Sequence, residues 1–314
     1  MEIQIPEGSF EYEELSGAAI ELTRYQGLSG HVEIPERLPG KQEHLPVGAI
    51  GKKAFLSKKY LRSVTVPKTV ESVGDWAFAF CDSLREVAFL GKDVTFGKDV
   101  FKECRNLTCI RFVEDGDPRK NPCHGNFGES CNGMGELTAA AVTQMESAYL
   151  LDAKEIGTAE WLEKWDARML AILRAPDDEG YAKQILCGEE DYESADLDTY
   201  LSNSRKKKVR LLLLRLLWPK GLSEETEREC RAYLLSHTKG CKTQEAWEVV
   251  RDGFGNRREF YELFARLGLF TKENATAVIA ETREDCPEMR AFFLRYQAEH
   301  FQAEKSDFFD ELEL

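Results

Sequence analysis

A 23-residue repeat is the feature that most restricts how this 314-residue chain can fold. Residues 73–89, VGDWAFAFCDSLREVAF, reappear 23 positions later as FGKDVFKECRNLTCIRF and 23 positions earlier as IGKKAFLSKKYLRSVTV. The shared positions hold a glycine, a phenylalanine and a leucine in every unit: Gly51, Gly74 and Gly97, Phe55, Phe78 and Phe101, and Leu61, Leu84 and Leu107. A unit this short cannot bury its own apolar side chains, so the units must stack on one another.

Two spacings inside the unit predict its local structure. Leu84, Val87 and Phe89 end the unit with the alternation of a short strand that buries one face. Phe78, Cys81 and Leu84 are three apart, and this spacing suits a single helical turn that returns the chain. Each unit is therefore predicted to contain one strand and one helical turn.

Stacking predicts ladders of like residues. Phe55, Phe78 and Phe101 form one ladder, and Cys81 above Cys104 forms a shorter one. We therefore interpret Cys81 as a small buried hydrophobe and not as a nucleophile or metal ligand, because no basic residue is placed to lower its pKa.

The repeated motifs resemble a known family. The pattern L-x-x-V-x-V-P at residues 61–67 and the pattern V-G-x-x-A-F-x-x-C-x-x-L at residues 73–84 resemble the BspA-type leucine-rich repeat. Residues 20–35 are similar to that family's opening strands, and the resemblance covers about residues 10–113. Leu90 replaces the proline of the other units, and the segment ERLPGKQEHLPVG lengthens the first unit by nine residues. The resemblance implies a solenoid that binds other macromolecules with an exposed strand face.

Alternation along the strands predicts which side chains face away from the core. Cys109 is one of them. Six others are the predicted partner-binding residues of a concave strip: Glu33, Ser63, Thr65, Glu86, Ala88 and Arg111. Small and mixed-charge side chains there suit a protein or peptide ligand, although every solenoid exposes some side chains on this face whether or not they bind.

Residues 114–135 are rich in Gly, Asn, Asp and Pro and are predicted to form a linker or cap loop. Cys123, His124 and Cys131, with Cys109 upstream, supply four donors of the kind that bind zinc. No C-x-x-C pair is present, and this favours loop residues over a zinc site, which stays open as an alternative.

Helical periodicity dominates from residue 136 onward. Thr158 is a predicted helix N-cap, and helices are predicted at 179–188, 196–218, 223–237, 243–252, 256–268, 271–284 and 287–302. Residues of about 205–301 resemble degenerate ankyrin-like helical hairpins, with a Leu267–Gly268 turn followed by a T-x-x-N motif at Thr271 and Asn274. The T-P-L-H core of ankyrin repeats is missing, so the resemblance implies paired helices in repeats.

Net charge and the length of the apolar runs argue against nucleic acid and a membrane span. The net charge of −14 disfavours nucleic acid, and the basic run RKKKVR at 205–210 is interpreted as a salt-bridging helix face. The longest apolar run, VRLLLLRLLW at 209–218, is too short to span a membrane. No secretory signal is visible at the start, so a cytoplasmic location is predicted, with the cell surface, common in the resembled family, as the alternative.

No enzyme motif is present. The five histidines form no recognisable catalytic constellation, and no nucleophile elbow, P-loop or dinucleotide fingerprint occurs. We therefore predict no catalytic residue, no cofactor and no small-molecule substrate.

The predicted fold class is α+β, with a short leucine-rich-repeat solenoid joined to an all-α helical-hairpin repeat domain. The predicted domains are 1–113 for the solenoid with its N-terminal capping strands, 114–135 for the linker and 136–314 for the helical part. The predicted function is a non-enzymatic protein–protein interaction or scaffold module. Two alternatives stay open: a bacterial surface protein that engages host or glycan ligands, and an enzyme or zinc protein with an unrecognised site.

Overall fold

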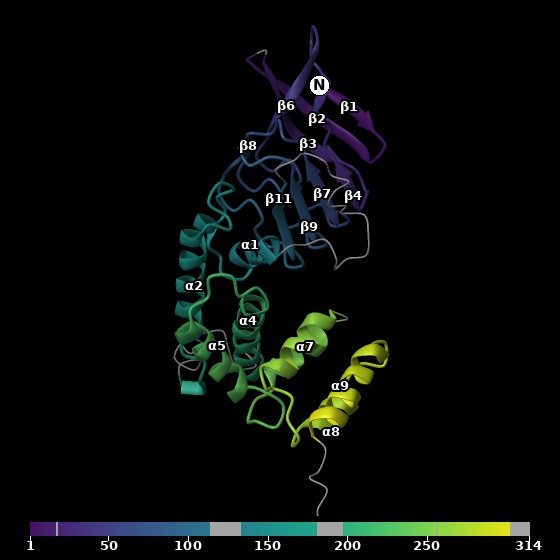
Figure 1. Cartoon of the computed structure of the whole chain (residues 1–314). Coiled ribbons are helices and arrows are strands. Elements are labelled where there is room, and N and C mark those ends of the chain that lie inside the picture. Colours follow the sequence, from purple (N-terminus) through teal and green to yellow (C-terminus); the bar gives the residue numbers. More distant parts are fainter. Residues whose placement is uncertain (17, 114–132, 181–196, 256, 302–314) are drawn as a thin grey trace, which may run out of the picture. The chain divides into compact units, whose positions relative to one another are not determined.

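The structure is a computed structural model that describes residues 1–16, 18–113, 133–180, 197–255 and 257–301 (Figure 1). The chain divides into two compact units, Met1–Met169 and Leu170–Leu314. The first holds the repeats and the second is helical, as the α+β prediction requires. The domain limits drawn from the sequence at residues 113 and 136 stay a prediction.

The first unit contains two sheets. The four-stranded sheet is parallel and runs in the order β11 (Cys109–Phe112), β9 (Glu86–Phe89), β7 (Ser63–Val66) and β4 (His31–Glu33), which lie side by side in Figure 1. The second sheet runs β1 (Glu2–Ile5), β2 (Gly8–Leu15), β3 (Ala19–Gln26), β6 (His44–Ile50), β8 (Ser72–Val73) and β10 (Thr95–Phe96), with β5 (Arg37–Pro39) paired to β6.

The strand register reproduces the sequence period. Ser63 pairs with Glu86, and Glu86 pairs with Cys109, each 23 residues further along the chain. His31 pairs with Ser63 across an offset of 32 residues, nine more than the period. These nine extra residues are accommodated where β5 and the start of β6 form an antiparallel ladder. The predicted insertion is therefore confirmed.

The predicted phenylalanine ladder is the centre of the core. Phe55 and Phe78 have ring centroids 4.9 Å apart, and Phe78 and Phe101 are 5.5 Å apart, with the rings nearly parallel in both pairs. Tyr25 extends the stack, with its ring centroid 5.2 Å from that of Phe55. All four rings are buried, so each repeat covers the aromatic ring of the one before it.

The segment that returns the chain is a series of hydrogen-bonded turns and not a continuous helix. Two residues in each turn have φ near +60°, in the left-handed region: Lys53 and Ser57, Trp76 and Phe80, Asp99 and Glu103. These residues interrupt a right-handed helix, and the backbone N–H groups donate to the next repeat instead. Lys53, Phe55 and Ser57 donate to the carbonyls of Asp75, Ala77 and Ala79 at 3.0, 2.7 and 2.9 Å.

The two stacked cysteines are buried, as predicted. Cys81 Sγ donates to the Phe55 carbonyl at 3.1 Å, and Cys104 Sγ donates to the Phe78 carbonyl at 3.0 Å. Burial raises the pKa of Cys81 to about 11 and that of Cys104 to about 12. Both sulfurs therefore act as core atoms with weak hydrogen bonds, which repeat from unit to unit.

Helical residues close the C-terminal end of the repeat core. Helix α1 (Gly133–Thr143) packs against β11, and Ala139 joins the same apolar cluster as the phenylalanine ladder. The 3-10 helix η2 (Ala148–Leu150) follows, and the buried Trp161 of α2 (Ala159–Arg174) donates its indole N–H to the Leu150 carbonyl at 2.8 Å. Thr158 Oγ1 accepts from the Trp161 backbone N–H, which confirms the predicted N-cap.

The second unit contains helices close to the predicted positions. They are α4 (Leu197–Leu217), α5 (Glu224–Ser236), α6 (Glu245–Glu248) with the π-helix η3 (Val249–Gly253), α7 (Arg258–Arg266), α8 (Ala275–Glu281) and α9 (Pro287–His300). Most of the predicted helix at 179–188 lies outside the described residues. Within the described segments, no helix combines the length and hydropathy needed to cross a membrane.

The T-x-x-N motif forms the turn between α7 and α8. Gly268 has φ +76°, which ends α7 in the left-handed conformation that favours glycine. Asn274 Oδ1 accepts from the Thr271 N–H at 2.9 Å, and its amide donates to the carbonyls of Leu269 and Lys239. The turn chemistry agrees with the sequence motif, whereas the ankyrin-like assignment stays a prediction.

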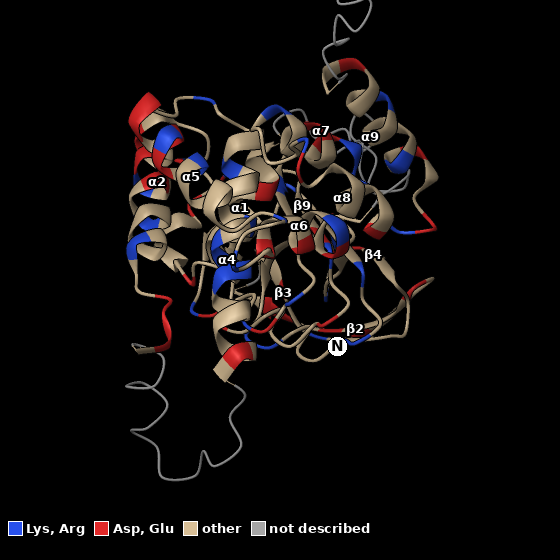
Figure 2. Ribbon diagram, turned by 90° about the horizontal axis from the view of Figure 1, so that it is seen from below, with Lys and Arg blue, Asp and Glu red and all other residues tan. Residues whose placement is uncertain are grey.

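The basic run on α4 pairs with acids of the same unit. Arg205 lies 3.6 Å from Glu245, Lys206 lies 2.8 Å from Glu248, and Lys208 lies 2.8 Å from Asp177. Figure 2 shows this run as the blue stretch of α4. The interpretation as a salt-bridging helix face is confirmed.

The buried thiols should resist alkylation. At about pH 8.5, near the pKa of an ordinary thiol, we expect iodoacetamide to modify the exposed Cys241 and to leave Cys81 and Cys104 intact. Their raised pKa values and burial both keep the reactive thiolate away from the reagent. Peptide-resolved mass spectrometry measures this, with guanidinium-unfolded protein as the positive control. Alkylation of Cys81 in the folded protein at the rate of Cys241 would contradict the assignment.

Loss of Lys208 should destabilise the helical unit. Burial alone raises the pKa of Asp177, but hydrogen bonds from Lys208 and Tyr233 outweigh it and hold the pKa below its usual value. Lys208→Met leaves a half-buried carboxylate without its cation, so we expect a loss of about 3 kcal/mol in the free energy of unfolding near neutral pH.

The sign of the pH dependence follows from the lowered pKa. The stabilisation is present above the unfolded-state pKa of Asp177 and is lost as the pH falls through the folded-state pKa. The difference between wild type and Lys208→Met should therefore shrink in acid, as measured by urea unfolding. The exposed Lys220→Met serves as the control, with an expected change within about 0.5 kcal/mol.

Candidate functional site

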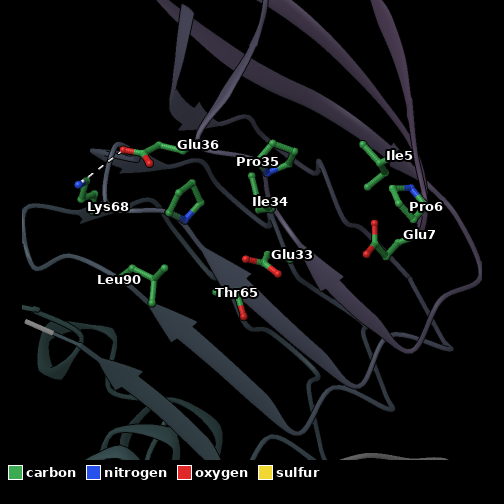
Figure 3. A pocket seen from close by; sticks show the side chains of 11 residues that line it. Ile5, Pro6, Glu7, Glu33, Ile34, Pro35, Glu36, Thr65, Lys68 and Leu90 are labelled. Carbon is green, nitrogen blue, oxygen red and sulfur yellow. Dashed lines mark ion pairs between the residues drawn. The ribbon is translucent and has the colours of Figure 1, made fainter. Parts of the chain in front are cut away.

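An open hollow of about 420 Å³ lies at the C-terminal ends of β4 and β7 (Figure 3). The turn between β1 and β2 forms one side, and the residues that follow β4, β7 and β9 form the rest. The apolar lining residues are Ile5, Pro6, Ile34, Pro35, Pro67 and Leu90, and the polar ones are Glu7, Glu33, Glu36, Thr65 and Lys68.

The charged side chains of the hollow are mostly acidic. Glu36 and Lys68 form an ion pair at 3.7 Å, in which both side chains are more than half exposed (Figure 3). Within the described part of the chain, the carboxylates of Glu7 and Glu33 have neither a hydrogen-bond donor nor a cation beside them. The hollow therefore keeps two uncompensated negative charges.

A proline leaves a backbone acceptor open at the same place. Leu90 N–H donates to the Val66 carbonyl at 2.9 Å and so continues the ladder beyond β7 and β9. The equivalent donor for the Ile34 carbonyl is Pro67, which has no N–H. Among the described residues, no group donates to the Ile34 carbonyl. This acceptor adds to the two carboxylates.

The predicted strip is only partly accessible. Pairing places Glu33, Thr65, Ala88 and Arg111 in one row across the sheet, as alternation predicts. Glu33 is exposed and Thr65 is half-buried, but Ala88 is 1% exposed and Arg111 is 4% exposed. The accessible part lies at β4 and β7, where both residues line the hollow. Partner binding by the six residues stays a prediction.

Side chains on the rest of the strip contact one another. Arg111 Nε lies 2.7 Å from Glu86 Oε1 on the neighbouring strand, an ion pair without the alignment of a hydrogen bond. Ser63 is buried, and its hydroxyl lies 2.7 Å from His31 Nδ1. The expectation of exposure was wrong for Ser63, Ala88, Cys109 and Arg111. Alternation gives the side of the strand and not the burial, and the long Arg111 side chain reaches its diagonal neighbour Glu86.

The structure leaves the zinc alternative untested. Cys109 is buried in β11, and Cys123, His124 and Cys131 lie outside the described residues. Within the described ranges, no three His, Cys, Asp or Glu side chains gather in a way that would hold a metal ion.

Two groups of residues that line the hollow were not predicted from the sequence. Pro35 and Pro67 were visible as the ends of strands, and their alignment at one period was the signal that they share an edge. Glu7 carried no such signal, because it belongs to the β1–β2 turn outside the repeats. The Tyr25 hydroxyl donates to the Glu7 carbonyl at 2.6 Å and holds this turn beside the repeats.

Removing Arg111 should be far more costly than removing Glu33. Arg111→Ala leaves Glu86, whose side chain is 13% exposed, without its cation, so we expect a loss of about 3 kcal/mol in the free energy of unfolding. Glu33→Ala should change it by no more than about 0.5 kcal/mol. Chemical denaturation measures both, and Glu86→Met with Arg111→Met should recover most of the loss. Equal effects of the two alanine variants would refute the burial of the pair.

Comparison with solved structures finds leucine-rich repeat proteins. A leucine rich cell surface protein from Faecalibacterium prausnitzii is 26% identical and covers 36% of this chain and 32% of its own, with a TM-score of 0.31. A leucine-rich repeat protein from Bacteroides ovatus is 23% identical, covers 35% of this chain and 29% of its own, and has a TM-score of 0.31. One from Bacteroides capillosus is 26% identical and covers 35% of this chain and 97% of its own, with a TM-score of 0.27.

This chain therefore spans about a third of the length of the first two of these proteins. No curated protein matches it. The family model described as the BspA type leucine rich repeat region matches residues 46–121, which include β7, β9 and β11. The stacked units within residues 46–121 thus match a BspA-type leucine-rich repeat region, as their motifs indicate.

Proposed function

We propose that this chain is a non-enzymatic protein-interaction module that binds an extended segment of a partner protein in the hollow at the ends of β4 and β7. One observation carries the proposal. Glu7, Glu33 and Ile34 line the hollow, and among the described residues neither the two carboxylates nor the Ile34 carbonyl has a donor. Such acceptors favour a ligand that brings hydrogen-bond donors and positive charge.

The lining residues define the chemistry of the partner segment. A lysine or arginine side chain supplies the donors that Glu7 and Glu33 lack. Pro35, Pro67 and Leu90 offer an apolar wall beside these acids, which suits an aliphatic side chain next to the basic one. Because the carboxylates are not fully buried, the attraction should weaken as salt is added.

The openness of the hollow favours a macromolecule over a small molecule. Pro6, Glu33, Glu36 and Lys68 are all exposed around it. A small ligand needs a site that encloses most of its surface, whereas a partner segment covers the open side with its own flanking residues. Protein binding is also the role that a leucine-rich repeat region suggests.

The other sequence-based expectations stay predictions. These are the cytoplasmic location, the absence of nucleic-acid and small-molecule ligands, and the absence of catalysis. The alternatives of a surface protein that engages host or glycan ligands, and of an enzyme or zinc protein, also stay open.

Selection from a random peptide display library on the full chain tests the proposal. We expect enriched peptides to carry a lysine or arginine next to an aliphatic residue. Their affinity should fall about tenfold in the variant Glu7→Gln with Glu33→Gln, because charge-assisted contacts are lost. The control variant is Glu2→Gln with Glu13→Gln, which removes two exposed acids that do not line the hollow. Peptides that bind all three proteins equally, or peptides without basic residues, would refute this function for the hollow.

A further inference from the structure

Two aromatic residues on the turn side of the repeats, the half-buried Trp76 and the exposed Phe80, lie outside the apolar core cluster. Each repeat has two left-handed turn positions, and the first and third repeats fill them with polar residues: Lys53 and Ser57 in the first, and Asp99 and Glu103 in the third. The middle repeat has Trp76 and Phe80 there, with φ of 58° and 59°. Because polar residues adopt the same backbone conformation in the other two repeats, the fold does not require aromatic residues at these positions.

Burial separates these two rings from the phenylalanine ladder. Phe78, between them in sequence, is fully buried, whereas Phe80 is 38% exposed and Trp76 is half-buried. The rings of Trp76 and Phe80 contact each other edge to face, with centroids 6.4 Å apart. Aromatic side chains contribute most to stability when they are buried, so an aromatic pair at the surface is unusual.

Lysines from the neighbouring repeats flank Trp76. Lys53 Nζ, from the preceding repeat, lies 5.4 Å from the Trp76 ring centroid, and Lys102 Nζ, from the following repeat, lies 5.7 Å from it. Both lysines are exposed, and among the described residues neither has a carboxylate within ion-pair distance. The Trp76 patch, defined as Lys53, Trp76, Phe80 and Lys102, therefore carries two free positive charges on a chain of net charge −14.

We infer that the Trp76 patch is a second binding surface, which takes an acidic segment of a partner protein with an apolar side chain between its carboxylates. The two lysines are free to bind the carboxylates, and the exposed part of Phe80 offers an apolar contact beside Trp76. Aromatic residues are enriched at the centres of protein interfaces. None of the four residues lines the hollow, so this surface is separate from the proposed basic-peptide site.

The geometry favours a peptide over a sugar. A sugar ring stacks on an open aromatic face, but the Trp76 ring has a lysine over it from each neighbouring repeat. The accessible apolar surface is that of Phe80, which lies edge to face with Trp76 and does not extend it into a flat platform. An aliphatic or aromatic side chain of a peptide fits this arrangement.

Fluorescence anisotropy with three labelled peptides tests the inference on the full chain. The probe peptide alternates glutamate with leucine or phenylalanine, a second replaces glutamate by lysine, and a third replaces the apolar residues by serine. The test variant is Trp76→Lys with Phe80→Ser, which installs the residues of the first repeat at the same backbone positions. Tyr149→Ser removes an exposed aromatic residue elsewhere and is the matched control.

We expect only the acidic apolar peptide to bind wild type and Tyr149→Ser. Its affinity should be about tenfold weaker for Trp76→Lys with Phe80→Ser, and also for Lys53→Ala with Lys102→Ala. The first variant adds a positive charge, so a purely electrostatic contact would become stronger in it. Glu7→Gln with Glu33→Gln should leave this binding intact, which separates the result from a failure of the hollow.

Four outcomes would overturn the inference. In the first, the acidic apolar peptide does not bind, and in the second the serine peptide binds equally well. In the third, the affinity is unchanged in Trp76→Lys with Phe80→Ser. In the fourth, the chain binds the polyanion dextran sulfate and does not bind the peptide. Circular dichroism checks that each variant is folded. If Trp76→Lys with Phe80→Ser does not fold, Lys53→Ala with Lys102→Ala decides the test, because both of its side chains are exposed.

Discussion

The backbone hydrogen bonds that join one repeat to the next are the interaction on which the first unit depends. Strands pair at a constant offset of 23 residues, and the turns repeat the arrangement when Lys53, Phe55 and Ser57 donate to the following repeat. A constant offset places like side chains over one another. The phenylalanine stack and the two buried cysteines follow from this register, and a shift by one residue would move the core side chains of the strands to the other face.

A stack of this kind has two ends that need covering, because an open sheet edge and an open core both invite other chains. Antiparallel strands β1, β2 and β3 cover the N-terminal end, and Tyr25 of β3 adds its ring to the phenylalanine stack. Helix α1 covers the C-terminal end, with alanines that allow a close approach to β11. The capping elements differ from the repeats because the end of a stack has a repeat on one side only.

Both proposed binding surfaces occur where the repeat places no demand on the side chain. At the strand ends, Pro67 stops the ladder and leaves the Ile34 carbonyl open beside Glu33. At the turns, the left-handed positions point to solvent and tolerate polar or aromatic residues alike, so Trp76 and Phe80 add contact area without disturbing the core. In a repeat protein, a departure from the pattern at an exposed position is therefore a guide to function.

The sequence by itself determined the period, the phenylalanine and cysteine ladders, the nine-residue insertion before β7, and most of the helix limits of the second unit. These depend on spacing, and spacing is visible along the chain. Only the tertiary structure decided that Arg111 is buried against Glu86, that Glu7 joins Glu33 in one hollow, and that the returning segment is a series of turns. Alternation shows on which side of a strand a residue lies, but a long side chain can lie along the sheet or extend from it. Which of the two conformations a side chain adopts depends on contacts with residues that are distant in the sequence and close only in the folded chain.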